Sequence, residues 1–184
     1  MPTESGTRTR TRRAILDAAV AVLSADATAS LGDVAAAAGV GRTTVHRYFP
    51  ERSDLLTAIG ADVLDKVAAA TDRARLGDGP APQALERLCQ ELFELGDRLT
   101  LLFDTPQLAD WSGWEEETDA DRALAELIER GRAEGTIDPE MDAAWVQNVL
   151  WALLYVAWEQ TREATPKHRA LTLCLHTLRK AISP

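Results

Sequence analysis

Residues 30–56 read SLGDVAAAAGVGRTTVHRYFPERSDLL, and this stretch decides the fold. Ser30 is a good N-cap, and Asp33 follows where a carboxylate faces the positive end of a helix. Gly39-Val40-Gly41 breaks the helical spacing, because glycine can adopt a left-handed conformation that ends a helix. A second short helix is predicted from Arg42 to about Phe49. Two short helices joined by a tight glycine-containing turn form a helix-turn-helix.

The second of these helices separates apolar from polar side chains. Val45, Phe49 and part of Tyr48 are predicted to face inward. The positions left on other faces are Arg42, Thr43, Thr44, His46 and Arg47. Such a helix fits the major groove of DNA, where arginine can fork onto guanine or grip phosphate and threonine can contact a thymine methyl. The alternative is a solvated helix face, which this turn and spacing do not favour.

The same stretch resembles the DNA-binding signature of the TetR family of bacterial repressors. It combines an A-x-x-A-G-V turn, a T-x-x-x-x-F-P helix and a following Leu-Leu at fixed spacings. The resemblance implies that Thr44 and Arg47 contact DNA and that Arg52, at the start of the next helix, contacts phosphate. His46 stands where tyrosine is common, Tyr48 where histidine is common, and Gly41 where a serine often caps the helix. These departures affect the base preference that the resemblance implies, and they leave the expected fold unchanged.

The rest of the chain also shows helical spacing, which predicts an all-α protein. The first 54 residues are expected to form the helix-turn-helix domain, and residues 55–184 a ligand-binding and dimerisation domain. The first helix is predicted over about 9–24, with an apolar stripe listed as Ile15, Ala18, Ala19, Val22 and Leu23. Later helices are predicted over 53–74, 83–103, 118–134, 140–162 and 166–182.

The formal net charge of −9 is unevenly distributed along the 184 residues. Residues 1–52 contain seven arginines and five acids, a charge of +2, whereas the remainder carries −11. A basic end suits a polyanionic partner, and an acidic body favours solubility. The first four arginines of the chain could form an arm along DNA or a solvated tail; they are Arg8, Arg10, Arg12 and Arg13.

The last two predicted helices indicate a homodimer. One is apolar most of the way round, and its first face carries Trp145, Val149, Ala152 and Val156. A helix apolar on more than one face must pack against more than one neighbour. The resemblance implies a four-helix bundle with two helices from each subunit. A purely intramolecular core is the alternative.

Aromatic side chains in the second part of the chain suggest a cavity for a small, lipophilic effector. The candidate residues are Phe93, Phe103, Trp111, Trp114, Trp151 and Tyr155. The alternative is that these aromatics fill a core, because periodicity does not separate core from cavity. The acidic run at 115–117 could attract a cationic compound or could open the next helix.

The sequence supports neither an enzyme nor a metal or cofactor site. It contains no nucleophile elbow or phosphate-cradling glycine loop, and its two cysteines and three histidines have no metal-ligand spacing. Cys89 and Cys174 are expected to be buried as small apolar residues. A helical interaction module that has lost DNA binding is the second functional hypothesis.

The N-terminus also allows a secretory signal as an alternative, since arginines precede an apolar stretch and residues 25–27 resemble a cleavage site. Asp17 interrupts that stretch, and its apolar residues have helical spacing, so a helix in a cytoplasmic protein is preferred. No apolar run is long enough to span a bilayer, so no membrane partner is expected.

Overall fold

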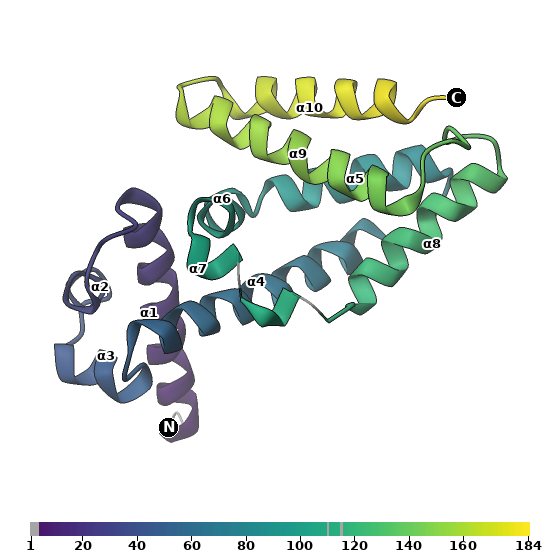
Figure 1. Cartoon of the computed structure of the whole chain (residues 1–184). Coiled ribbons are helices and arrows are strands. Elements are labelled where there is room, and N and C mark those ends of the chain that lie inside the picture. The colour runs from purple at the N-terminus through teal and green to yellow at the C-terminus, as the bar shows by residue number, and fades with distance from the viewer. Residues whose placement is uncertain (1–3, 110, 115) are drawn as a thin grey trace. The chain divides into compact units, whose positions relative to one another are not determined.

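The computed structural model describes residues 4–109, 111–114 and 116–184, and these residues are helical with no strand among them. The prediction of an all-α protein is therefore confirmed. The chain forms two compact units, the first made of residues up to 63 together with 97–113, and the second of residues 64–96 together with 114–184. Figure 1 labels the helices along the chain. The expected functional division after residue 54 stays a prediction.

The helices have the following bounds. They are α1 (Glu4–Ala25), α2 (Leu31–Ala37), α3 (Arg42–Tyr48), α4 (Arg52–Ala74), α5 (Ala81–Phe93), α6 (Gly96–Asp104), α7 (Pro106–Ala109), a single 3₁₀ turn (Ser112–Trp114), α8 (Asp119–Ala133), α9 (Ala143–Arg162) and α10 (Lys167–Ile182). None of the described helices is both long and apolar enough to cross a membrane.

Helix α1 differs from the prediction in its start and in its buried face. It begins at Glu4, so the N-terminal arginines belong to a helix and not to an extended arm. Its buried stripe contains Leu16 and Val20, whereas Ala18 and Val22, which were expected inside, are half-buried. The predicted stripe was rotated because the alanines made two neighbouring faces look equally apolar. The larger side chains decide which face is buried, since they remove more apolar area from water.

The predicted helix-turn-helix is present in the first unit, where α2 packs on both α1 and α3 (Figure 1). Ser30 caps α2 by accepting a hydrogen bond from the Asp33 amide at 3.3 Å, and Asp33 returns one by accepting from the Ser30 amide at 2.7 Å. Gly39 has a φ of +65°, the left-handed conformation predicted for the turn. Gly41 precedes α3 and has no side chain with which to cap it.

The first half of α4 completes the core of the first unit. Leu55, Leu56, Ile59 and Val63 are buried. Trp111 packs directly on this helix at Gly60, where an added Cβ would lie 2.6 Å from the indole ring. The close approach therefore requires glycine at this position, and it places Trp111 against α4.

The second unit is built from α5, α8, α9 and α10 with the second half of α4. Helices α9 and α10 lie side by side, and both pack on α5 (Figure 1). Two arginines satisfy carbonyls at the end of α4 and in the loop that follows it, where helical donors run out. Arg87 donates to the carbonyls of Ala74, Arg75 and Asp78, and Arg130 donates to those of Leu76 and Gly79.

The predicted helix over 83–103 is wrong, because the chain breaks between α5 and α6. The carbonyl of Phe93 accepts a hydrogen bond from the indole Nε1–H of Trp158 at 3.0 Å. Gly96 then lies against the same indole, with an added Cβ 3.5 Å from the ring. A tertiary contact therefore replaces helix continuation at this point, and Gly96 was the local signal for it.

Helix α9 presents two different faces in the single chain. Val146, Leu150, Leu154 and Trp158 are buried in the second unit. On the opposite side, Trp145 is 59% exposed and Val156 is 57% exposed. Leu173 of the neighbouring α10 is 52% exposed. An apolar surface formed by Trp145, Val149, Ala152 and Val156 is therefore left open by the chain's own packing.

Candidate nucleic-acid interface

Helix α3 has the two faces that its sequence predicted. Val45 and Phe49 are 0% and 2% exposed, so they anchor the helix in the core of the first unit. Thr44 and Tyr48 are half-buried at the boundary. The exposed side chains are Arg42, Thr43, His46 and Arg47. A seven-residue helix anchored by two apolar residues thus projects two arginines, a threonine and a histidine into solvent.

Arg42 lies back over the first turn of α2. A Cβ added at Gly32 would lie 2.4 Å from Arg42 Nη2, so the guanidinium rests on a position that has no side chain. The pKa of the nearby Asp33 carboxyl is lowered, chiefly by the side-chain and backbone hydrogen bonds from Ser30 and to a smaller degree by the charge of Arg42. Arg42 therefore extends the positive charge of α3 toward the beginning of α2.

Arginines from α1 and α3 gather around the aromatic side chains at the end of α3. The guanidinium carbon of Arg47 lies 5.6 Å from the centre of the Tyr48 ring, and that of Arg8 lies 6.0 Å from it. Arg12 lies 5.5 Å from the centre of the Phe49 ring. Cation–π contacts at exposed sites contribute about 0.5–1 kcal/mol each. We call Arg8, Arg12, Arg42 and Arg47 the basic surface of the first unit.

The His46 ring is oriented by the turn that follows α3. Its Nδ1 lies 3.2 Å from the carbonyl oxygen of Pro50. A carbonyl oxygen can only accept, so Nδ1 carries the proton in this contact. On a neutral ring Nε2 is then the acceptor, and His46 is exposed. The side chain can therefore offer an acceptor to a partner beyond α3.

Arg52 lies at the predicted place but is engaged with the protein backbone. Its Nη1 donates to the carbonyl of Ala29, and its Nη2 donates to the carbonyl of Ala27 at 2.5 Å. The side chain is half-buried. It therefore ties the start of α4 to the loop before α2. The phosphate contact implied by the sequence resemblance stays a prediction, and the sequence offered no signal for this bracing contact.

Four alternating charges connect three helices of the first unit. Arg13 of α1 pairs with Asp17 at 3.1 Å and with Asp62 of α4 at 2.5 Å. Arg98 of α6 pairs with the same two carboxylates, at 3.4 Å for Asp62. Burial alone would lower the pKa of Arg13, but its hydrogen bonds to both aspartates outweigh that effect and raise it. We call these four residues the ion-pair network.

The ion-pair network changes the expectation for Arg13. This arginine was grouped with Arg8, Arg10 and Arg12 as a candidate arm, but its guanidinium is held by Asp17 and Asp62. The i,i+4 spacing of Arg13 and Asp17 was a readable signal for one of these contacts. The contacts of Arg98 and Asp62 join residues 36 positions apart and had none.

The six candidate ligand residues divide between the two units. Phe103 and Trp111 lie in the first unit, and Phe103 is 42% exposed. The second unit contains the buried Phe93 and the half-buried Trp114, Trp151 and Tyr155. These four side chains come from α5, the 3₁₀ turn and α9.

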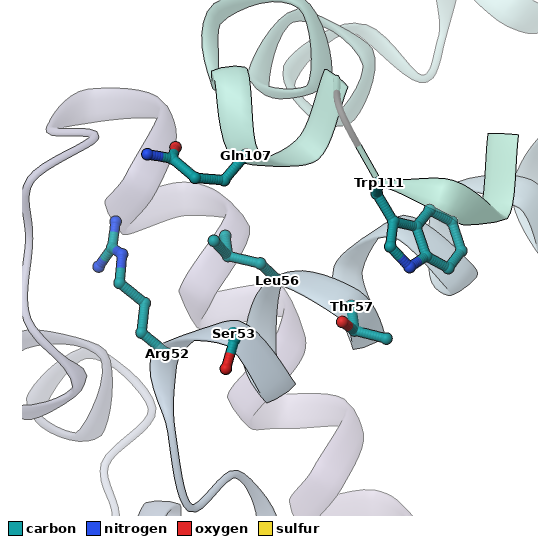
Figure 2. Close-up of a pocket in the computed structure, with 6 residues that line it drawn as sticks. All are labelled: Arg52, Ser53, Leu56, Thr57, Gln107 and Trp111. Carbon is teal, nitrogen blue, oxygen red and sulfur yellow. The ribbon is translucent and has the colours of Figure 1, made fainter.

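One of the six, Trp111, lines a pocket of about 270 Å³ in the first unit. Figure 2 shows Trp111 on the same side as Thr57, Arg52 and Gln107 on the other side, and Leu56 between them. Ser53 completes the described lining. Apolar and polar groups therefore meet in this pocket, and its one charged side chain is a cation.

The described part of the chain holds no cluster of three or more His, Cys, Asp or Glu side chains able to bind an ion.

Comparison with known proteins identifies relatives over nearly the whole chain. The sequence profile described as bacterial regulatory proteins, tetR family, matches residues 15–59. The HTH-type transcriptional repressor LfrR of Mycolicibacterium smegmatis is 42% identical over 180 residues, which cover 97% of this chain and 94% of LfrR. The repressor KstR of the same organism is 28% identical over 177 residues, covering 91% of this chain and 86% of KstR.

Solved structures also resemble this chain over nearly its whole length. LfrR from Mycobacterium smegmatis in complex with proflavine superposes with a TM-score of 0.73 at 38% identity, covering 95% of this chain and 98% of the LfrR chain. A TetR-family regulator from Haemophilus influenzae has a TM-score of 0.74 at 11% identity, covering 97% and 99% of the two chains, and so shares the fold.

The ion-pair network should stabilise the first unit through Asp62, whose side chain is 10% exposed. Replacing Asp62 by Asn keeps its shape but removes the charge that both arginines use. We expect the free energy of unfolding, measured by urea denaturation, to fall by about 1–2 kcal/mol. The exposed Asp65→Asn on the same helix is the matched control. Equal losses in the two variants would contradict a specific role for the network.

Proposed function

Because this chain belongs to the TetR family of bacterial transcriptional regulators and is not an enzyme, we propose that it is a dimeric, ligand-responsive repressor. It binds a palindromic DNA operator and is released by a small lipophilic effector. The observation that carries this proposal is the exposed polar face of α3, set beside the arginines of α1. The DNA contacts are proposed to come from Arg42, Thr43, Thr44, His46, Arg47, Tyr48 and Arg52.

The chemistry of α3 supports binding in the major groove. The groove is about 12 Å wide and admits one helix. The buried Val45 and Phe49 hold the helix by one side, so Arg47 and Thr43 project from the other. Arg8 and Arg12, beside the end of α3, add charge suited to phosphates. Arg47 is proposed to read a base, since guanidinium can pair with guanine O6 and N7.

A dimer is proposed because a single helix-turn-helix contacts only a half-site. Two reading helices about 34–36 Å apart match successive turns of the major groove. The open apolar surface of α9 offers the contact, because Trp145 and Val156 are more than half exposed in the single chain. Such apolar surface is costly in water and is covered when a second copy packs its own α9 and α10 against it.

An aromatic effector is supported by the aromatic side chains and by the similarity to LfrR, whose structure contains proflavine. Proflavine is a planar aromatic cation at neutral pH. Phe93, Trp114, Trp151 and Tyr155 are the proposed apolar contacts in the second unit. Phe103 and Trp111 are separate candidates in the first unit. Arg52 makes the pocket at Trp111 unfavourable for a cation. A cationic effector is therefore assigned to the aromatics of the second unit.

Release from DNA follows from a difference in affinity between two dimer shapes. One shape spaces its two α3 helices for adjacent major grooves, and the other does not. An effector that binds the second shape better lowers operator affinity by that difference and no more. Helix α4 belongs to both units of the chain and is the proposed link between them.

Arg47→Ala should weaken operator binding by about 1–3 kcal/mol if Arg47 reads a base. Fluorescence anisotropy with the intergenic DNA beside the gene measures the change. Arg122→Ala removes the same charge from α8 and should leave the affinity unchanged. Operator affinity and salt dependence that match wild type in Arg47→Ala would remove Arg47 from the contact set.

Val156→Glu should break the dimer, because it places a charge on the open apolar surface of α9. We expect a monomer by light scattering at micromolar concentration, and at least a tenfold weaker binding of the full palindrome. Ala69→Glu places the same charge on an exposed position of α4 and serves as the control. A Val156→Glu variant that stays dimeric would exclude this surface.

Trp151→Ala should reduce proflavine binding about tenfold if Trp151 contacts the effector. Calorimetric titration of the protein without DNA is the suitable measurement, since proflavine itself binds duplex DNA. Tyr48→Ala removes a half-buried aromatic ring from α3 and should bind the dye like wild type. Equal affinity of all three proteins would place the dye elsewhere, and absence of saturable binding would exclude this effector class.

A further inference from the structure

The two cysteines of the chain meet in the second unit. Cys89 lies on α5 and Cys174 on α10, and the two Sγ atoms are 3.6 Å apart. Both thiols are free, and the residues are 0% and 4% exposed. Their separation of 85 positions gave no sign of this contact in the sequence. The expectation that both cysteines are buried as small apolar residues does not explain why their two sulfurs lie next to each other.

We propose that Cys89 and Cys174 form a reversible intramolecular disulfide that clamps α10 to α5 when the protein meets a peroxide. A disulfide bond is about 2.05 Å long, so the sulfurs must approach by roughly 1.5 Å. Small rotations of the two side chains can supply that movement, because α5 and α10 already pack on each other. No other protein chain or metal is required.

A second contact between the same helices keeps the cysteines facing each other. Glu86 lies one turn before Cys89, and Arg179 lies just over one turn after Cys174. Arg179 donates from Nε and Nη2 to the two carboxylate oxygens of Glu86, at 2.7 and 3.0 Å. A bidentate pair fixes geometry as well as charge. The register of α10 on α5 is therefore set before any sulfur reacts.

The environment distinguishes the two thiols. The hydrogen bond from Cys89 lowers the pKa of the Cys174 thiol against the opposing effect of burial. The pKa of Cys89 is raised by the same pairing, by burial and by the charge of Glu86. Cys174 is also the more exposed of the two residues, at 4% against 0%. The thiolate is the reactive species, so Cys174 is the first sulfur to be oxidised.

The chemistry balances with hydrogen peroxide as the oxidant. The Cys174 thiolate attacks one peroxide oxygen, the O–O bond breaks, and hydroxide leaves with the thiol proton as water. The product is a sulfenic acid at Cys174. The Cys89 sulfur then attacks the Cys174 sulfur, the S–O bond breaks, and a second water leaves with the Cys89 proton. Two thiols and one peroxide give one disulfide and two waters.

The disulfide should increase the stability of the second unit. It closes a long loop of the chain, which restricts the unfolded state most strongly. We expect the oxidised protein to melt about 5–10 °C higher than the reduced protein. Amide exchange should slow in α5 and α10 and stay unchanged in α2 and α3. These readouts involve no DNA or effector, so they are independent of the proposed function.

The test is to expose the reduced full chain to hydrogen peroxide, alkylate the remaining thiols and map the peptides by mass spectrometry. The expected result is the loss of two hydrogen atoms and a Cys89–Cys174 cross-linked peptide, both reversed by dithiothreitol. Cys89→Ala should stop at an oxygen adduct on Cys174 and show no rise in Tm. Thiols that stay free when peroxide fully oxidises dithiothreitol in the same buffer would overturn the proposal. So would a cross-link between chains, or sulfinic acid formed without a disulfide.

Discussion

The burial of Val45 and Phe49 determines the orientation of α3. Each side chain removes apolar area from water worth about 2–3 kcal/mol, which exceeds what the few hydrogen bonds of a seven-residue helix contribute alone. With these two residues fixed inside, the helical repeat directs Arg42, Thr43, His46 and Arg47 to the outside. The capping box and the left-handed Gly39 stabilise the two ends of α2, the helix against which α3 packs. The proposed DNA contact is a consequence of this packing.

Two sets of contacts join the helices of the first unit to one another. Arg52 ties the beginning of α4 to the loop before α2, and the ion-pair network ties α1, α4 and α6 together. Both α4 and the segment containing α6 continue directly into the second unit along the chain. Along the chain, α4 therefore joins the second unit to the loop before α2, and the segment containing α6 joins it to α1 and α4. This arrangement gives the proposed effector response a physical route.

Much of the fold could be predicted from the sequence because its determinants are local. The Ser30 cap, the Gly39 turn and the inward Val45 and Phe49 are each encoded within a few residues, and the structure has all of them. The break between α5 and α6 was missed because Gly96 was its one local signal, and its other determinant, Trp158, lies 65 positions from its hydrogen-bond partner. The rotated stripe of α1 was missed because alanine-rich faces differ little in hydrophobicity. Long-range pairs such as Arg98 with Asp62, and Cys89 with Cys174, leave no periodic signal.

In the candidate site, too, local features could be predicted from the sequence and long-range contacts could not. The exposed set on α3 could be predicted, but the engagement of Arg52 with backbone carbonyls and the stacking of Arg8 and Arg12 near the end of α3 could not. The candidate effector residues were selected by residue type alone. The structure distributes them over both units, because aromatic side chains serve cores as well as ligand sites.

The most direct test of the central claim is fluorescence anisotropy of the purified protein with the intergenic DNA beside its gene, at two salt concentrations and against a scrambled duplex. The account predicts tight binding that is selective for the native sequence, falls steeply with salt and saturates at two subunits per palindrome. Binding no tighter than to the scrambled duplex, at both salt concentrations and with candidate effectors present or absent, would contradict it. That result would favour a helical interaction module instead.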